Sequence, residues 1–306
     1  MGKNNKDVLK SVNYNMEIIK KIKENQPFTI DQKEEMLNVY TGISKDNNSY
    51  FTPYEICNFI KQLLDIRKSK VTDLSAGIGN MVRPFIKEYG KLDDEIQFDC
   101  FELDENNSLV GSTAWEDYKQ VNFHTNFNSL DRADEIQDNY YDFIIGNPPF
   151  TGTTKYMCEW NNNKGKAKNN KLVDCFVDLC IKKCKNKGFI ALVLPGGHLF
   201  NGNGTAKLRQ WMRSKVALKG LFPLDSKTFE NAGILGTSVG TNLIVFQKGV
   251  KQETIFVGEL TDKDDIKLEM KSLAMQFRLF LSGDYHLNTL SDSYNGLHAL
   301  LKEGAA

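Results

Sequence analysis

The sequence has few residues suited to binding metals and no segment suited to a membrane. It contains four histidines and six cysteines; the cysteines form no CxxC pair and have no histidine at zinc-site spacing. No apolar run approaches the ~18 residues of a membrane-spanning helix, and residues 1–5 lack the apolar segment of a signal peptide. We therefore expect free thiols, no metal, no membrane partner and a cytoplasmic location.

The chain also lacks an excess of charge of either sign. Its 39 basic and 39 acidic residues give a formal net charge of zero. A protein that binds nucleic acid without a partner protein is usually basic, because neutralisation of the phosphates supplies much of the binding affinity. This charge balance does not exclude nucleic acid as a partner, but it points to a local basic patch or to a partner protein that supplies the affinity for nucleic acid.

One stretch, DFIIGNPPF at residues 142–150, has the pattern of a strand that ends in a binding turn. The apolar residues indicate a buried strand, and the double proline stops it. Asn147 and its neighbouring carbonyls then lie at the carboxyl edge of the strand, where open α/β sheets bind ligands. An amide oxygen beside a carbonyl suits an NH2 group, and the Phe150 ring suits a flat base. The alternative is an ordinary Asn-Pro turn.

Two earlier segments have the pattern of a nucleotide site. Residues 71–80 predict a strand, a small-residue turn and a helix start, in which Gly77 and Gly79 let the main chain approach a ligand. Residues 98–104 predict a second strand that ends in acids, and a carboxylate there can accept both ribose hydroxyls. Glu102 is the predicted acceptor, with Asp104 as an accessory. A helix N-terminus also favours acids, which accounts for Asp104 without a ligand.

Together these motifs resemble those of the γ-class N6-adenine DNA methyltransferases, and in particular the modification subunit of type I restriction systems. NPPF at 147–150 is similar to the catalytic motif, DLSAGIG at 73–79 to the first cofactor motif, and YFTP at 50–53 to the element that precedes it. Leu74 departs from the proline that is frequent there. The resemblance implies an α/β class I S-adenosylmethionine-dependent methyltransferase fold, Rossmann-like, with a seven-stranded mixed sheet and an N-terminal helical extension. The expected domains are 1–48 (helical), 49–260 (catalytic) and 261–306 (a helical extension).

The resemblance also implies which residues form the site. The implied catalytic residues are Asn147, Pro148, Pro149 and Phe150. The implied contacts to S-adenosyl-L-methionine are Phe51, Thr52, Pro53, Asp73, Ser75, Gly77, Gly79, Glu102, Leu103, Asn126 and Phe127, with Asn126 standing where the family carries an acid. Phe229 is the implied stacking residue for the target base. YFTP also has a purely structural interpretation, with Thr52 as the N-cap and Pro53 as the first residue of a helix.

A polar segment at residues 151–171 follows NPPF. It has a net charge of plus four, from Lys155, Lys164, Lys166, Lys168, Lys171 and Glu159. A loop of this length in a compact domain is often a binding loop or a lid, so Lys155 and Lys171 are predicted to contact the DNA backbone. The alternative is a disordered, Asn-rich insertion.

Apolar residues at three- and four-residue steps, among them Val12, Met16 and Ile19, predict an N-terminal helix, and a second helix is predicted over 32–40. These helices can pack on the core or dock another subunit; we expect packing. Further strands are predicted at 120–125, 187–195, 216–224, 241–248 and 253–257.

The resemblance implies methyl transfer to the N6 amine of adenine in DNA, after the base has flipped out of the duplex. Asn147 and the Pro148 carbonyl would accept the two amine hydrogens, so catalysis would rest on positioning and electrostatics. Methylation of an rRNA base or of a protein glutamine amide by the same NPP-type site is the alternative. Nothing after residue 260 resembles a DNA-reading module, so either a separate specificity subunit reads the target or recognition is short.

Overall fold

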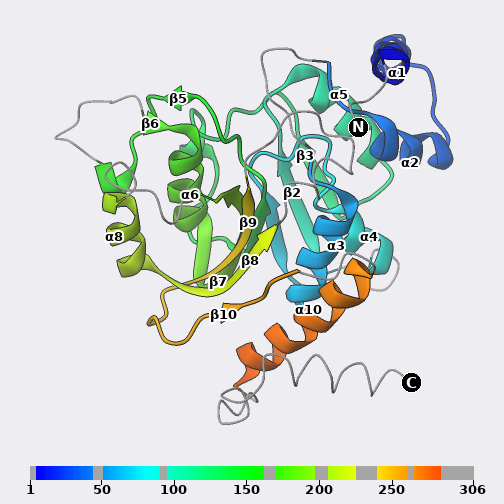
Figure 1. Ribbon diagram of the computed structural model, residues 1–306. Helices are drawn as coiled ribbons and strands as arrows, with labels where there is room; N and C mark the ends of the chain where they lie inside the picture. Colours follow the sequence, from blue (N-terminus) through cyan, green and yellow to red (C-terminus); the bar gives the residue numbers. More distant parts are fainter. Residues whose placement is uncertain are drawn as a thin grey trace.

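The computed structural model describes residues 5–43, 51–89, 95–161, 170–196, 206–224, 240–260 and 265–283. Its centre is a sheet in the order β10-β8-β9-β7-β4-β1-β2-β3 (Figure 1). Neighbouring strands are parallel except at β9, which runs antiparallel to both β7 and β8. The α/β class with a mixed sheet is confirmed. The sheet has eight strands rather than the seven that the resemblance implies; the edge strand β10 pairs with β8 and lies within the strand predicted at 253–257.

The strands of the sheet are β1 (Lys70–Asp73), β2 (Gln97–Phe101), β3 (Val121–His124), β4 (Tyr141–Gly146), β7 (Cys184–Pro195), β8 (Val216–Leu224), β9 (Thr241–Lys248) and β10 (Phe256–Val257). The described α-helices are α1 (Asn5–Lys23), α2 (Ile30–Val39), α3 (Tyr54–Leu63), α4 (Arg83–Tyr89), α5 (Glu105–Trp115), α6 (Leu172–Lys183), α8 (Ala206–Lys215) and α10 (Ile266–Ser282). Two short 3-10 helices are η1 (Ala133–Glu135) and η2 (Glu159–Asn161).

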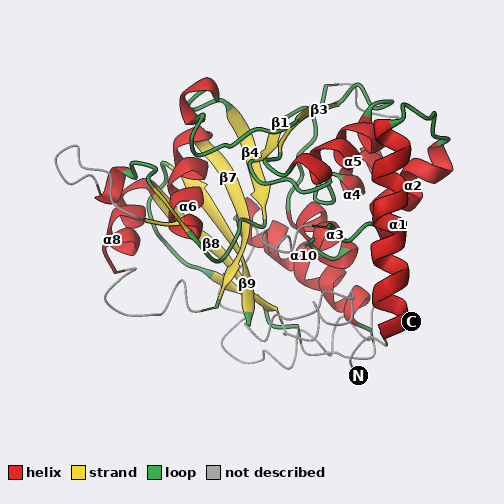
Figure 2. Cartoon of the chain, turned by 90° about the horizontal axis from the view of Figure 1, so that it is seen from above, coloured by secondary structure: helices red, strands yellow, loops and turns green. Residues whose placement is uncertain are grey.

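Helices cover both faces of the sheet. Along β7, Ala191 and Val193 belong to the core shared with α3, α4, α5 and α10, whereas Ile190 and Leu192 belong to the core shared with α6 and α8. Figure 2 shows these two groups of helices on opposite sides of the strands. Because successive side chains of a strand point to opposite faces, a strand covered on both faces must be apolar throughout. No helix in the described ranges has the length and hydropathy that a membrane crossing requires.

The N-terminal helices form a layer at the β3 end of the sheet, where α1 and α2 pack against α5 (Figures 1 and 2). The buried Lys33 of α2 forms ion pairs with Glu116 and Asp117, at 2.6 and 2.5 Å. Ile19 is buried as predicted, but Val12 and Met16 are 41% and 56% exposed. Asn15 and Ile18 are buried beside Ile19. The buried face of α1 is therefore rotated relative to the predicted apolar stripe.

Two local predictions are corrected by the structure. Thr52 does not cap α3, because the backbone N–H groups of Ile56 and Cys57 donate to the Pro53 carbonyl, each at 3.1 Å, which makes Pro53 the N-cap. Thr52 is buried instead. The predicted irregular loop after NPPF contains a small antiparallel hairpin, in which β5 (Thr153–Thr154) pairs with β6 (Asn170–Lys171).

Candidate active site

A cavity of about 560 Å³ lies at the carboxyl ends of β1, β2 and β4. Parallel pairing of β1 with both neighbours brings these strand ends to one edge of the sheet. Thirteen of the predicted site residues line the cavity: Phe51, Thr52, Asp73, Ser75, Gly77, Glu102, Leu103, Asp104, Phe127, Asn147, Pro148, Pro149 and Phe150. A volume of this size suits a small organic ligand or cofactor.

Some predicted site residues are absent from the cavity wall. Asn126 is exposed in a turn with φ +51°, and its backbone N–H donates to the Ser108 hydroxyl at 3.0 Å. Pro53 caps α3, and Gly79 faces Trp115. Lys171 of β6 and Lys155, which follows β5, are exposed and do not line the cavity, whereas Thr153 and Thr154 of β5 do. Phe229 lies outside the described residues, as do Lys164, Lys166 and Lys168.

The glycine turn after β1 is held between two aromatic rings. Gly77 has φ +61°, and a Cβ atom there would lie 2.8 Å from the Phe51 ring. Gly79 has φ +85°, and a Cβ atom there would lie 2.4 Å from Nε1 of Trp115, which donates to the Ile78 carbonyl at 2.8 Å. Both the backbone angles and the close rings require glycine, so the turn presents bare main chain to the cavity.

Two buried carboxyl groups stand on either side of this turn. Asp73, at the end of β1, accepts the Ser75 N–H at 3.0 Å, and Glu102, after β2, accepts the Gly77 N–H at 2.7 Å. Burial raises the pKa of both groups to about 7, although the backbone hydrogen bonds oppose the rise. The charge of Glu102 adds to the rise in the pKa of Asp73. Within the described residues, neither carboxyl group forms an ion pair.

This arrangement fits a positively charged nucleoside ligand. Two buried acids without a described counter-charge gain stability when a cation reaches them. The turn at Gly77 allows close approach of a ligand, and Phe51 and Phe127 offer aromatic surface. S-adenosylmethionine carries an ammonium group, a sulfonium group and ribose hydroxyls, so its chemistry matches this set of side chains.

The NPPF turn belongs to the same cavity. It follows Gly146, the last residue of β4, and a Cβ atom at Gly146 would lie 3.2 Å from Oδ1 of Asp73. Asn147 and Phe150 are half-buried and Pro148 is buried. The amide of Asn147 and the carboxyl group of Asp73 therefore come from adjacent strands and line one space.

Sequence reasoning missed part of the wall after Phe127. The Asn128 side chain accepts the backbone N–H groups of Leu130 and Asp131, at 3.1 and 3.2 Å, and the Ser129 hydroxyl donates to the Leu74 carbonyl at 2.7 Å. The Asn128-x-x-Asp131 spacing is the local signal of such a turn. The contact between this turn and Leu74, just after β1, depends on packing between distant segments, so no local sequence pattern indicates it.

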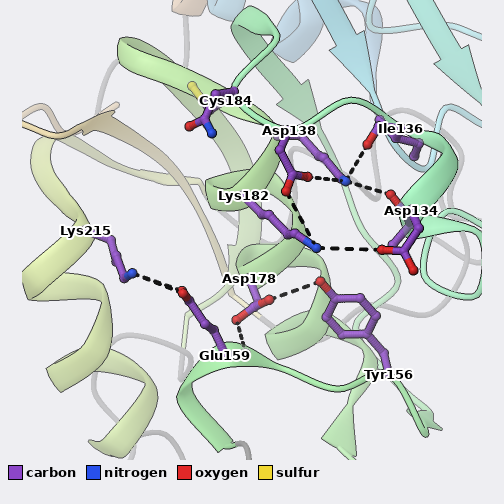
Figure 3. Close-up of polar contacts among 12 residues, drawn as sticks. Asp134, Ile136, Asp138, Tyr156, Glu159, Asp178, Lys182, Cys184 and Lys215 are labelled. Atoms are coloured by element: carbon purple, nitrogen blue, oxygen red, sulfur yellow. Dashed lines mark hydrogen bonds and ion pairs between the residues drawn. The ribbon is translucent and has the colours of Figure 1, made fainter.

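Leu172 and Phe176 of α6 also line the cavity, and α6 is tied to the surrounding loops (Figure 3). Lys183, 1% exposed, donates to the carbonyls of Ala133 and Ile136 and to Asp138, at 2.5–2.6 Å. Asp178 accepts the Tyr156 hydroxyl at 3.1 Å and the Glu159 N–H at 2.9 Å. These bonds connect α6 to residues 133–138, which follow Phe127 in the chain, and to residues 156–159, which follow the NPPF turn.

Comparison with known proteins gives one family. A family model described as N-6 DNA methylase matches residues 29–278. The methylase subunit of the type I restriction enzyme EcoEI from Escherichia coli is 28% identical over 153 residues, which are 50% of this chain and 30% of that subunit. The matched part therefore spans less than a third of this relative.

Solved structures show the fold. A type I restriction-modification methyltransferase subunit from Streptococcus thermophilus matches 78% of this chain and 58% of its own, at TM-score 0.61 and 19% identity. A Listeria monocytogenes protein described as a class I S-adenosylmethionine-dependent methyltransferase matches 81% of this chain and 80% of its own, at TM-score 0.61 and 14% identity. The fold is thus that of class I S-adenosylmethionine-dependent methyltransferases, and S-adenosylmethionine is the cofactor that the fold and the cavity imply.

Proposed function

The chain belongs to the N-6 DNA methylase family, and we propose that it transfers a methyl group from S-adenosylmethionine to the N6 amine of adenine in DNA. One observation carries the proposal. The Asn147-Pro148-Pro149-Phe150 turn lines the same cavity as the buried acids Asp73 and Glu102. An acceptor for an amine and acceptors for a charged nucleoside therefore line one cavity.

The cofactor would be held by the strand ends. Asp73 would accept from its ammonium group, and Glu102 would accept from its ribose hydroxyls, since each carboxylate oxygen has a second lone pair besides the one used by the backbone. Phe127 and Leu103 supply apolar surface for its adenine ring. When bound, S-adenosylmethionine supplies an electrophilic methyl group on its sulfonium.

The NPPF turn would hold the target amine. The adenine N6 lone pair is delocalised into the ring and is a poor nucleophile. The Asn147 amide oxygen and the Pro148 carbonyl would each accept one amine hydrogen, which favours a pyramidal nitrogen with its lone pair free to react. Phe150 would stack on the base, which must leave the duplex to enter the cavity. These groups act by position and charge, and the acidic proton of the methylated nitrogen can pass to water, so no general base is required.

Contacts to the DNA backbone are proposed for Lys155 and Lys171. Both are exposed, and Lys171 pairs with Thr153 in the hairpin beside the cavity. The whole chain has no net positive charge, which favours a separate specificity subunit that reads the sequence and adds affinity.

The test offers methyl-labelled S-adenosylmethionine with unmethylated DNA, and in parallel with RNA and with protein, followed by digestion of the labelled product to nucleosides or amino acids. We expect N6-methyladenine from the wild type and a loss of about 10²-fold or more in kcat for Asn147→Ala, with cofactor affinity unchanged. Asn122→Ala is the matched control, because this exposed β3 amide does not line the cavity. Label that appears only in RNA or in protein glutamine would contradict a DNA substrate, and equal activity of the two variants would contradict the role of Asn147.

A further inference from the structure

We infer that Asn15 of α1 is a positioning residue for the cofactor cavity, because it clamps residues 40–42 against Phe51. The N-terminal helical layer then forms part of the cofactor site, although α1 itself contributes no residue to the cavity wall. The inference rests on the proposed function, because its measurable consequence is a change in affinity for the cofactor.

The clamp consists of hydrogen bonds from one buried side chain. Asn15 is 0% exposed, and its amide nitrogen donates to the Gly42 carbonyl at 2.8 Å and to the Thr41 hydroxyl at 3.0 Å. Its amide oxygen accepts the Thr41 N–H at 3.3 Å. Ser11, one turn earlier on α1, adds a hydrogen bond to the same hydroxyl at 2.7 Å. A side chain whose amide nitrogen and amide oxygen both hydrogen-bond to one segment holds that segment in position.

The clamped segment packs on Phe51. Gly42 has φ +85°, and its Cβ position lies 3.6 Å from Cε2 of Phe51, while the Tyr40 and Phe51 ring centroids lie 6.0 Å apart. The opposite edge of the Phe51 ring, at Cδ1 and Cε1, covers Gly77. Phe51 is thus held between the clamped segment and the glycine turn, and it lines the cavity.

Tyr40 gives a second link to the site. It is 3% exposed, and among the described residues its hydroxyl has no hydrogen-bond partner. Burial raises its pKa, and the charges of Asp104 and Glu102 raise it further. The segment that Asn15 clamps therefore also sits beside the acids at the end of β2.

Loss of the clamp would let Phe51 leave its place for part of the time. The apparent dissociation constant then rises in inverse proportion to the fraction of molecules that remain competent, so a site that is competent a tenth of the time binds about tenfold more weakly. Chemistry in the loaded enzyme is untouched, because no atom of the clamp reaches the reacting groups. The expected signature is a higher KM for S-adenosylmethionine with an unchanged kcat at saturation.

The experiment is calorimetric titration of the full chain with S-adenosylhomocysteine, the demethylated product, for wild type, Asn15→Ala, Thr41→Val and Lys33→Met. Thr41→Val keeps the shape of an exposed residue and removes only its hydroxyl, so it tests the clamp even if Asn15→Ala folds poorly. Lys33→Met is the matched control, because it removes the ion pairs of the buried Lys33 ammonium with Glu116 and Asp117, just after α5, without touching the clamp.

We expect about tenfold weaker binding for Asn15→Ala, a smaller loss for Thr41→Val, and a lower Tm with unchanged affinity for Lys33→Met. Unchanged affinity of both clamp variants, or an equal loss in Lys33→Met, would overturn the inference while leaving the proposed function intact. A wild type that binds no S-adenosylhomocysteine would contradict the proposed function itself.

Discussion

Glu102 accepts the backbone N–H of Gly77 at 2.7 Å, and this bond ties the end of β2 to the glycine turn after β1. The other carboxylate oxygen of Glu102 accepts the Asp104 N–H, also at 2.7 Å. The side chain is therefore positioned by the main chain of two segments before any ligand arrives. Preorganisation of this kind lowers the entropy cost of binding.

Gly77→Ala should disrupt the turn and the cofactor site together. The residue needs φ +61°, and the new Cβ would lie 2.8 Å from the Phe51 ring. We expect the free energy of unfolding to fall by about 1–3 kcal/mol and binding of S-adenosylhomocysteine to be lost. Gly240→Ala is the control, because its φ is not positive and its Cβ would meet no atom within 4 Å. Denaturant titration and calorimetry measure both effects, and equal behaviour of the two variants would refute the role of the turn.

Cofactor affinity should fall as the pH drops below about 7. The pKa values of Asp73 and Glu102 are both raised to about 7, chiefly by burial, and a cationic ligand requires their ionised forms. Binding then releases protons, and the dissociation constant rises by up to about tenfold per pH unit for each proton released. Titrations in buffers of different ionisation enthalpy measure this release. A dissociation constant independent of pH between about 5.5 and 8.5 would contradict the prediction.

Asp73→Asn should stabilise the ligand-free protein at high pH and change little at low pH. The folded-state pKa of Asp73, about 7, lies above its ordinary value of 3.8, so the folded state binds the proton more tightly. The stability that this group contributes is complete below its unfolded pKa and is lost as the pH rises through about 7. The asparagine keeps the oxygen that accepts the Ser75 N–H and carries no charge. The Tm at about pH 8.5 should therefore rise by a few degrees.

Asp99→Asn is a control for which we expect the opposite change in Tm, because the pKa of Asp99 is lowered where that of Asp73 is raised. Burial raises the pKa of Asp99, but hydrogen bonds from His124, Tyr141 and Asn122 outweigh it and leave the pKa below its ordinary value. Its stabilising effect is present above the unfolded pKa and is lost as the pH falls, so this variant should lower the Tm at neutral and high pH. A Tm gain for Asp73→Asn confined to low pH would contradict the assignment.

Lys182 and Lys183 are adjacent on α6, but we expect substitution of Lys183 to destabilise the protein much more than substitution of Lys182. Figure 3 shows the contacts of Lys182 with Asp134 and Asp138. Lys183→Met removes three hydrogen bonds donated by a buried ammonium group, to the Ala133 and Ile136 carbonyls and to Asp138, so we expect the free energy of unfolding to fall by about 2–4 kcal/mol. Lys182 is 43% exposed and contacts Asp134 and Asp138 at 3.9 and 3.8 Å, so Lys182→Met should cost less than about 1 kcal/mol. Urea unfolding measures both, and equal costs would show that burial of Lys183 adds nothing.

Much of the fold follows from local patterns. Strands are predicted at 216–224 and 241–248 with the bounds that the structure has, because both are apolar runs covered on two faces. The glycine turn, the acidic strand end and the double proline each carry a local signal, and they line one cavity. The family resemblance in these motifs agrees with the family match over residues 29–278.

Other features have no local signal. In the β5–β6 hairpin, Thr153 pairs with Lys171 across a long polar segment. The polar sequence between the two short strands therefore predicts a loop rather than a hairpin. Asn126 is predicted as a cofactor contact, yet the turn at φ +51° leaves it exposed, and Asn128 and Ser129 line the cavity beside Phe127. The stripe of α1 that faces inward depends on where α5 lies, which periodicity alone does not reveal.

The sequence by itself determined where strands end, where the chain must turn and which residues carry amide, carboxyl and aromatic groups, because these depend on side-chain type and near neighbours. Only the tertiary structure decided that Asp73 and Glu102 are buried on both sides of one turn, with pKa values raised to about 7. It likewise decided that Asn15, far from every motif, holds the segment behind Phe51. Burial and contact are properties of segments that meet, and the parallel sheet brings them together from distant parts of the chain.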